Sequence, residues 1–329
     1  MNISVIGAGG WGTAIAVHLA QKKFRVTLWE NFPDYQKVLQ TKRENIKFLP
    51  GIKIPDEIVL TSDINTAVKD KDVIVLVIPS KYLRQVLQKI KSFNKKALFV
   101  SCVKGIEENT LLRMSEVAED VLGEINIGVL SGPSHAVEVA RGIPTTVVGA
   151  GNSETAGRIQ EIFMGGNLRV YANTDMVGVE LGGALKNIIA IACGISDGLG
   201  YGDNTKAALM TRGLAEISRL GIKMGAQPLT FAGLAGMGDM IVTCTSKHSR
   251  NRKVGEEIGR GKSLNEVLKS MEMVAEGVWT TKSALKLADN LGVEMPITQA
   301  VYEVLWGNKK PVVAVGELMG RTPKEESPE

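Results

Sequence analysis

Residues 2–30 read NISVIGAGGWGTAIAVHLAQKKFRVTLWE, and this stretch decides the fold. Residues 2–7 are a short apolar run rich in β-branched side chains, which is typical of a buried strand. Glycines follow at Gly7, Gly9 and Gly12, and the next eleven residues have helical periodicity. A second short strand then ends at an acidic residue, Glu30. The expected order is therefore strand, glycine-rich turn, helix and strand.

This order is the context in which a G-x-G-x-x-G turn binds a dinucleotide. Gly7 would allow the tight turn, Gly9 the approach of the pyrophosphate, and Gly12 the close packing of helix on strand. The helix would then direct its first N–H groups at the phosphates. A turn that is merely rich in glycine is the alternative. We favour a Rossmann-type domain that binds NAD(H) or NADP(H).

The same alternation continues to residue 173 and then stops. Continuous apolar runs, typical of parallel strands buried on both faces, occur at residues 72–80, 96–105, 125–133, 144–151 and 168–173. Helices are expected after Ser80, which could cap the first of them, and over residues 106–122 and 154–163. Beyond Thr174 every periodic segment is helical: residues 175–194, 205–224, 252–259, 264–270, 280–291 and 299–306.

The sequence therefore predicts an α/β protein with two domains. Residues 1–174 would form the Rossmann domain and residues 175–321 an all-helical substrate and catalytic domain. We expect a ligand cleft between them and a short, disordered polar tail over residues 322–329.

Composition limits the classes of function. With 44% hydrophobic residues, 22% charged residues and a net charge of +4, the chain looks like an ordinary globular protein and an unlikely partner for nucleic acid. No charged leader precedes the first strand, and we expect no apolar run near the roughly 20 residues that span a bilayer. We therefore expect a cytoplasmic protein without membrane contact. Three histidines without ligand spacing indicate no metal site, and Cys102, Cys193 and Cys244 are expected to be buried thiols in a reducing compartment.

Residues 175–194, DMVGVELGGALKNIIAIACG, predict a mostly buried helix with one unusual face. An apolar stripe consists of Val177, Leu181, Leu185 and Ile189, and a second stripe of Gly178, Gly182, Lys186, Ala190 and Gly194. Glycine in a helix interior costs roughly 0.5–1 kcal/mol relative to alanine, so something should need a close approach to this face. Burial would lower the pKa of Lys186 toward a range useful for proton transfer. The alternative is that Lys186 extends along its own stem to solvent.

Polar residues follow several of the strands. Lys104 ends one strand, Ser131 to Ala136 (SGPSHA) follow another, and a glycine-rich chain leads to Asp239. His135 suggests a general acid, although it has no evident carboxylate partner. The basic cluster at residues 246–253 begins a helix, where Ser249 could cap and Arg250 could bind a phosphate. The alternative interpretation is that these residues are solvated and only form turns or the start of a helix.

Longer motifs carry a resemblance to a known family. GAGGWGTA at 7–14, VSCVKGI at 100–106, SGPSHAVEVA at 131–140, residues 185–217, residues 231–251 and VAEGV at 274–278 occur in the family's order. Over essentially its whole length the chain resembles NAD(P)-dependent glycerol-3-phosphate dehydrogenases of the bacterial type. The resemblance implies an oxidoreductase that interconverts dihydroxyacetone phosphate and sn-glycerol 3-phosphate, supplies glycerophospholipid synthesis, and forms a homodimer.

The resemblance also implies roles for individual residues. Lys186 would be the proton donor and acceptor, with Lys104, Asp239, Asn187 and Thr243 as further catalytic residues. The substrate would contact Lys104, Gly132, Ser134, Lys186, Asp239, Ser249, Arg250 and Asn251. The dinucleotide would contact Gly7, Gly9, Gly10, Trp11, Gly12, Glu30, Asn31, Phe32, Lys104, Ala136, Arg250, Val274 and Glu276.

These roles agree with the chemistry. Hydride addition to the C2 carbonyl leaves negative charge on the oxygen, and a lysine at Lys186 provides both a cation and a proton. We expect Asp239 to hold the ammonium of Lys186, and Lys104 to lower its pKa as a second cation. The small-residue stripe would let the nicotinamide and a three-carbon substrate lie against the helix.

Two questions stay open at this stage. Glu30 stands where the family often has a His or Arg, and it would bind an unphosphorylated ribose but repel the 2′-phosphate of NADPH. Lys37, Arg43 or Lys47 could compensate, so Glu30 favours NAD and the family habit favours NADPH. A related 3-hydroxyacid or ketopantoate-type dehydrogenase is the second functional hypothesis, and a non-enzymatic dinucleotide sensor the least favoured.

Overall fold

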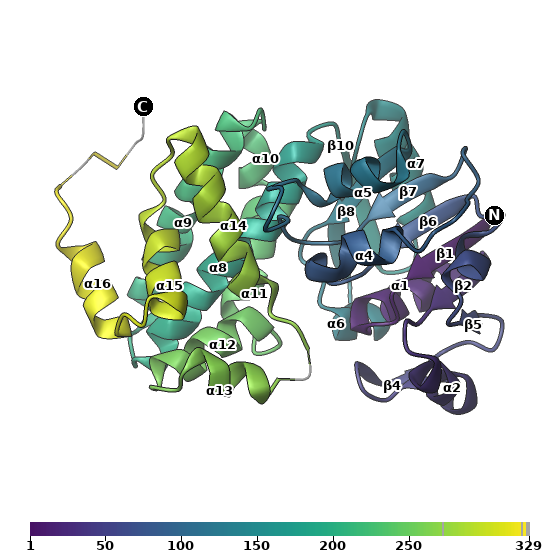
Figure 1. Ribbon diagram of the computed structural model, residues 1–329, viewed down its shortest axis with the longest axis horizontal. Helices are drawn as coiled ribbons and strands as arrows, with labels where there is room; N and C mark the ends of the chain where they lie inside the picture. Colours follow the sequence, from purple (N-terminus) through teal and green to yellow (C-terminus); the bar gives the residue numbers. More distant parts are fainter. Residues whose placement is uncertain (272, 324, 327–329) are drawn as a thin grey trace. The chain divides into compact units, whose positions relative to one another are not determined.

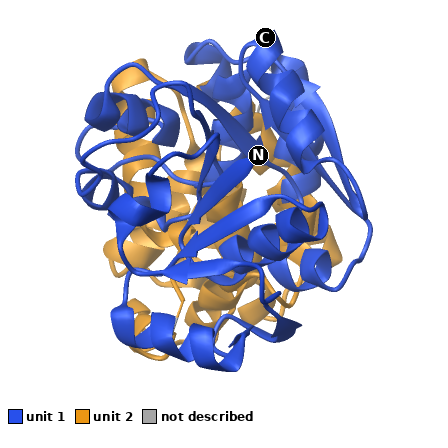
Figure 2. Ribbon diagram, turned by 90° about the vertical axis from the view of Figure 1, so that its right-hand side faces the viewer, with its two compact units in different colours: residues 1–184, 221–239 blue, residues 185–220, 240–329 orange. Residues whose placement is uncertain are grey.

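The computed structural model describes residues 1–271, 273–323 and 325–326. They form two compact units (Figure 2): unit 1 is Met1–Ala184 with Gly221–Asp239, and unit 2 is Leu185–Leu220 with Met240–Glu329. The predicted boundary near Thr174 lies just after the last strand. Unit 1 extends beyond it to Ala184 and includes Gly221–Asp239, in which the backbone N–H of Gln227 donates to Asp175 at 2.8 Å.

Unit 1 is built on an eight-stranded sheet in the order β10-β9-β8-β7-β6-β1-β2-β5 (Figure 1). The strands are β1 Asn2–Ile6, β2 Arg25–Trp29, β5 Val59–Thr61, β6 Val73–Leu76, β7 Leu98–Ser101, β8 Asn126–Ser131, β9 Thr145–Ala150 and β10 Leu168–Asn173. Neighbouring strands are parallel except β8 and β9, which are antiparallel. All the predicted strands exist, and the Rossmann-type prediction is confirmed.

Alternating side chains of the central strands build two apolar layers, one on each face of the sheet. Ile3 and Val5 of β1 belong to a core with helices α1 (Gly10–Gln21) and α7 (Ser153–Phe163). Ile6 belongs to a second core with α3 (Ile64–Val68), α4 (Leu83–Leu87) and α5 (Met114–Leu122). Because both faces are covered, the strands are apolar throughout, as expected for parallel strands.

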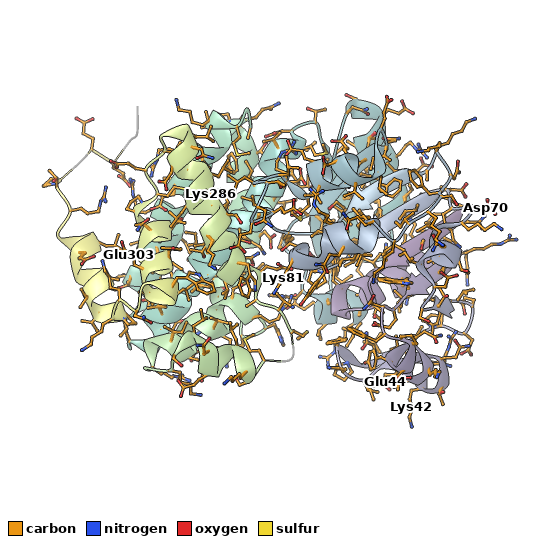
Figure 3. All side chains as sticks on the ribbon, in the orientation of Figure 1. Lys42, Glu44, Asp70, Lys81, Lys286 and Glu303 are labelled. Atoms are coloured by element: carbon orange, nitrogen blue, oxygen red, sulfur yellow. The ribbon has the colours of Figure 1, made fainter. Side chains whose placement is uncertain are left out.

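Several elements differ from the sequence prediction. Residues 80–82 form a short 3₁₀ turn, η1 (Ser80–Tyr82), and Tyr82 rather than Ser80 occupies the N-cap of α4. The helix predicted over 106–122 begins only at Met114, because Arg113 and Glu116 form a capping box there. The prediction missed α2 (Pro33–Lys42), α6 (Ala136–Ala140) and the hairpin of β3 (Glu44–Asn45) and β4 (Leu49–Lys53). In this hairpin Glu44, labelled in Figure 3, accepts the backbone N–H of Gly51 at 2.8 Å.

Among the described residues beyond Asn173 there are helices and no strand, which confirms the all-helical prediction. They are α8 Met176–Gly198, α9 Asp203–Lys223, α10 Pro228–Ala232, the π-helical turn η2 Leu234–Gly238, α11 Asp239–Thr245, α12 Arg250–Gly259, α13 Leu264–Lys269, α14 Glu276–Leu291, α15 Pro296–Trp306 and α16 Pro311–Met319. The glycine-rich chain that leads to Asp239 is helical, since α10 and η2 lie in it and α11 begins at Asp239. Part of the predicted disordered tail, residues 324 and 327–329, lies outside the described residues.

Helix α8 is the longest helix of the described chain and belongs to both units, which divide between Ala184 and Leu185. Its 23 residues have a mean hydropathy of 1.5 over the most apolar window, so by length and composition it could cross a membrane. The expectation that no apolar run reaches this length is therefore wrong. However, 89% of that window is buried within the protein, as in a core helix.

Candidate active site

The glycine-rich turn between β1 and α1 has one side open and the other packed. Gly7 has a φ of +119°, and a Cβ there would lie 2.4 Å from the carbonyl oxygen of Val77. A Cβ on Gly12 would lie 1.9 Å from the carbonyl oxygen of Gly7, whereas one on Gly9 would meet nothing within 4 Å. No side chain caps the first turn of α1. The turn therefore leaves open the position at which a pyrophosphate approaches, and the residues fit a dinucleotide.

The side chain of Asn45 holds this turn in place through hydrogen bonds, and Asn45 was not among the residues predicted from the sequence. Its side chain is buried, and its amide nitrogen donates to the carbonyl oxygen of Ala8 and to the hydroxyl of Thr13, each at 2.8 Å. Its amide oxygen accepts from the hydroxyl of Tyr35 at 2.8 Å. An asparagine in a short unpredicted hairpin gives no periodic signal, so only the folded chain reveals this contact.

Two further dinucleotide candidates lie at the same turn. A Cβ on Gly10 would lie 2.7 Å from the carbonyl oxygen of Phe48 and 3.6 Å from the Cβ of Ala136, the first residue of α6. Trp11 packs, partly buried, against the core of β1 and α1. His135 occupies the N-cap of α6 without capping it through its side chain.

Glu30 follows β2 and is buried, with a carboxylate that accepts the backbone N–H of Phe32 at 3.0 Å. Burial raises the pKa of Glu30, while the N–H groups of Phe32 and Asn31 and the charge of Lys47 oppose this. Lys89 donates to the side-chain oxygen of Asn31 at 3.2 Å. An acid and two lysines therefore lie around the end of β2.

Three cations could compensate for Glu30 at the 2′-phosphate of NADPH: Lys37, Arg43 and Lys47. They differ in their surroundings. Arg43 donates to the carbonyl oxygens of Pro55 and Ile58, at 2.8 and 3.0 Å, so its guanidinium supports a loop. Lys37 lies 3.7 Å from its exposed neighbour Asp34. Of the three, Lys47 is the one whose positive charge lowers the pKa of Glu30.

Lys104 lies three residues beyond β7 and forms an ion pair with Asp239, with 2.5 Å between Nζ and Oδ2. The Asp239 side chain is 2% exposed and that of Lys104 is 21% exposed. Lys104 also donates to the carbonyl oxygen of Gly132 at 3.2 Å, and the hydroxyl of Ser134 donates to the same oxygen at 2.9 Å. Unit 1 thus brings three predicted substrate residues, Asp239, Gly132 and Ser134, together around a fourth, Lys104.

Lys186 in unit 2 is only 5% exposed, so the alternative that it extends into solvent is wrong. Its ammonium donates to the hydroxyl of Thr243 on α11 at 2.5 Å. Asp239 and Thr243 stand one turn apart on α11, which therefore carries a partner for each of the two lysines.

Asn251 lies in the first turn of α12 and is 8% exposed. Its amide nitrogen donates to the side-chain oxygen of Asn187 at 2.9 Å, and its amide oxygen accepts the backbone N–H of Gly277 at 2.9 Å. Ser249 caps α12 as predicted, accepting the backbone N–H of Arg252 at 3.2 Å.

Arg250 begins α12, and its side chain is accessible to solvent. Surrounding protein atoms lower the pKa of its guanidinium by partial loss of hydration, and the carboxylate of Glu276 at the start of α14 acts in the opposite direction. Val274 lies just before that helix, two residues from Glu276. An accessible arginine at a helix start suits an anionic ligand.

The glycine stripe of α8 packs against other helices, which corrects one prediction. A Cβ on Gly182 would lie 2.7 Å from the carbonyl oxygen of Ala235, and one on Gly194 would lie 2.0 Å from that of Arg252. Gly255 of α12 approaches α8 equally closely, with 2.0 Å between its would-be Cβ and the carbonyl oxygen of Ile191. Backbone, rather than nicotinamide or substrate, fills the space at these glycines.

All three cysteines are free and buried, as predicted. Burial raises the pKa of the Cys102 thiol to about 12, although the charge of Lys104 opposes this. A thiol with such a pKa is a poor nucleophile, so Cys102 is structural.

Comparison with known proteins identifies the family of this chain. Residues 2–157 match the model of the NAD-dependent glycerol-3-phosphate dehydrogenase N-terminus, and residues 175–316 match that of the C-terminus. The chain belongs to the NAD-dependent glycerol-3-phosphate dehydrogenase family.

Individual members are similar over their full lengths. The glycerol-3-phosphate dehydrogenase (NAD(P)+) of Geobacillus kaustophilus is 54% identical over 330 residues, which are 99% of this chain and 96% of that protein. The crystal structure of the Coxiella burnetii glycerol-3-phosphate dehydrogenase has a TM-score of 0.94 at 38% identity, covering 97% of this chain and 99% of that one. The ketopantoate reductase of Ralstonia eutropha, at 14% identity and a TM-score of 0.60 over 97% of this chain and 100% of that one, shares the fold alone.

Proposed function

We propose that this chain reduces dihydroxyacetone phosphate to sn-glycerol 3-phosphate with NADH or NADPH, and catalyses the reverse reaction. The observation that carries the proposal is Lys186, a buried lysine on an apolar helix whose ammonium bonds to Thr243. A buried cation is costly and is retained where it does chemistry. Names of family members supply the substrate, and the accessible Arg250 at the start of α12 supports a phosphate.

The bound nicotinamide would supply the hydride that the substrate carbon accepts. Lys186 stabilises the negative charge that develops on the C2 oxygen and delivers the proton to it. Thr243 holds the Lys186 ammonium in one orientation. We propose that the carboxylate of Asp239 also holds the ammonium of Lys186. Lys104 contributes a second positive charge, which lowers the pKa of Lys186.

The remaining candidate residues bind and orient. The turn from Gly7 to Gly12 binds the pyrophosphate, and Glu30, with Asn31 and Phe32, binds the adenosine ribose. We assign Ala136, Val274 and Glu276 to the cofactor as well. Lys104, Gly132 and Ser134 bind the substrate, and Ser249, Arg250 and Asn251 form the phosphate site, in which Arg250 also contacts the cofactor.

The cellular setting is part of the proposal. We propose a cytoplasmic homodimer, without membrane association, that supplies glycerol 3-phosphate for phospholipid synthesis. The buried position of α8 supports the absence of a membrane span.

A spectroscopic assay tests the proposed reaction. Purified protein with dihydroxyacetone phosphate should oxidise NADH or NADPH, seen as loss of the reduced nicotinamide absorbance. Folded protein that leaves both cofactors unchanged would refute the proposal. Faster turnover of an unphosphorylated keto acid would favour a ketopantoate-type activity instead.

A further inference from the structure

An ion-pair cluster joins the end of α8 to the starts of α9 and α12, all within unit 2. Asp197 is the last residue but one of α8, and each of its carboxylate oxygens contacts a different helix. Oδ2 accepts from Nε of Arg252 at 2.7 Å and lies 2.6 Å from Nη2 of the same guanidinium. Oδ1 lies 2.8 Å from Nζ of Lys206. The Asp197 side chain is 13% exposed and those of Lys206 and Arg252 are each 17% exposed, so solvent screens these pairs only in part.

Each of these charges lies at the unfavourable end of its own helix. A helix carries a partial positive charge at its N-terminus and a partial negative charge at its C-terminus. Asp197 is an anion in the last turn of α8, whereas Lys206 and Arg252 are cations in the first turns of α9 and α12. The first turn of α12 contains no acidic residue of its own. The contacts between the helices, rather than the stability of each helix, therefore account for these three residues.

The backbones of α8 and α12 meet next to this cluster. A Cβ on Gly198 would lie 2.3 Å from the carbonyl oxygen of Glu256, and one on Gly259 would lie 2.4 Å from that of Ile195. Packing of this kind brings the two helices close together. The charge-assisted bonds from the Arg252 guanidinium add a fixed direction to this contact.

The restrained segment of α12 is the one that the proposed function assigns to the phosphate. Ser249 caps α12 by accepting the backbone N–H of Arg252 at 3.2 Å, so both the N–H and the guanidinium of Arg252 are bonded. Arg250 and Asn251 lie between these two residues in the same turn. A displacement of Arg252 would therefore move the whole candidate phosphate site.

We propose that Asp197 is a positioning residue for this phosphate site. Through Arg252 it holds the first turn of α12 where Arg250 binds the phosphate of the substrate. An anion would repel a phosphate in direct contact, so the contribution of Asp197 comes through the guanidinium that neutralises it. This inference rests on the proposed function and adds to it a residue at the far end of α8.

Asp197→Asn tests the positioning role. The amide has the size of the carboxylate, but it has one acceptor oxygen and turns its NH₂ group toward one of the two cations. The KM for dihydroxyacetone phosphate should rise by about fivefold or more with kcat within about twofold of wild type, because the phosphate is held in the ground state and the transition state alike. An unchanged KM would refute the proposal.

Dihydroxyacetone, which lacks the phosphate, separates phosphate binding from general damage to the fold. Asp197→Asn and wild type should reduce it with kcat/KM values within about twofold of each other. Damage to the fold would instead lower kcat/KM for dihydroxyacetone and for dihydroxyacetone phosphate in the same proportion. Such a parallel fall would refute the positioning role.

A double-mutant cycle tests whether Asp197 acts through Arg252. Arg252→Met removes the guanidinium and should raise the KM for dihydroxyacetone phosphate about as much as Asp197→Asn does. Adding Asp197→Asn to Arg252→Met should then change this KM by less than about twofold, since the group that Asp197 positions is gone. A larger change in either direction would show that Asp197 acts by another route.

Glu257→Gln is the matched control, because Glu257 is another ion-paired acid on α12. Its carboxylate pairs with Lys262 and Arg260 and not with Arg252. Its KM and kcat should therefore match wild type. An equal rise of the KM in Glu257→Gln would mean that any ion pair on α12 has this effect, and the specific role of Asp197 would be lost.

A second variant covers the case in which Asp197→Asn does not fold. Arg252→Lys keeps the positive charge but cannot donate from two nitrogens to one carboxylate oxygen, so the KM for dihydroxyacetone phosphate should again rise. An unchanged KM in Arg252→Lys would then refute the proposal. Failure of wild type to turn over dihydroxyacetone phosphate would count against the proposed function, whereas active wild type with unaffected variants counts against the role of Asp197 alone.

Discussion

Lys186 is buried, and the proposed reaction depends on its ammonium group. Lys186→Ala should lower kcat by about 100- to 10,000-fold, because the developing oxyanion loses both its cation and its proton source. Dinucleotide affinity should stay within about threefold of wild type, since unit 1 contains the glycine-rich turn. Steady-state kinetics and fluorescence titration with NADH measure the two quantities.

Lys286→Ala is the matched control for Lys186→Ala. Lys286 is an exposed lysine on α14, labelled in Figure 3, and its removal should leave kcat unchanged. Near-normal turnover in Lys186→Ala would contradict the catalytic assignment.

Glu30 is the residue that bears on cofactor preference. Its buried carboxylate should repel a 2′-phosphate, so Glu30→Ala should lower the ratio of the KM for NADPH to the KM for NADH by about tenfold. Lys47, which acts on the charge of Glu30, would then act on the phosphate instead. Kinetics with both cofactors give the ratio, and Glu57→Ala, at an exposed carboxylate, serves as control. An unchanged ratio would show that Glu30 does not discriminate.

At the scale of elements, the glycines of α8 and α12 form a close helix pair. Gly194→Ala would place a methyl group 2.0 Å from the carbonyl oxygen of Arg252, so the helices must separate. We expect a loss of about 1–3 kcal/mol in the free energy of unfolding, measured by urea denaturation. Because α12 also carries Arg250 and Asn251, the KM for dihydroxyacetone phosphate should rise as well.

Gly157→Ala in α7 is the opposite case. A Cβ there meets nothing within 4 Å, so alanine should stabilise the helix by about 0.5–1 kcal/mol. If both substitutions changed stability equally, close packing would not explain the glycines of α8.

For the whole molecule, Glu216 makes stability depend on pH. This buried carboxylate on α9 accepts the backbone N–H groups of Ile297 and Thr298 at the start of α15, and burial raises its pKa to about 7. A raised folded pKa means that the folded state binds the proton more tightly than the unfolded state. The contribution is therefore complete below the ordinary carboxyl pKa and is lost as pH rises through about 7.

Glu216→Gln should remove this dependence. The difference in melting temperature between wild type and Glu216→Gln should change between pH 4.5 and 7, in the sense that wild type loses stability relative to the variant as pH rises. Thermal melts across this range measure the difference, and Glu161→Gln, at an exposed site, controls for surface charge. A constant difference would contradict the raised pKa.

Local patterns in the chain were sufficient for the dinucleotide turn, the strands of the sheet, the helical second half and the family. These features follow from residues near one another in sequence: glycine spacing at Gly7, Gly9 and Gly12, unbroken apolar strands, and helical periodicity. The short elements were missed, because α10 and the hairpin at Asn45 have too few residues to show a period. The hydrogen-bond and ion-pair partners of the site residues could not be predicted from local sequence either.

Only the tertiary structure decided which groups meet. The ion pair of Asp239 with Lys104, which is 135 residues away in sequence, is one such contact that the sequence analysis did not predict. The glycines of α8 signalled a close approach, but whether ligand or backbone approaches them depends on where α12 packs. The direction of the amides of Asn187 and Asn251 depends on the N–H of Gly277. Composition and periodicity record which groups a chain carries, whereas distances between remote groups exist only once the chain has folded.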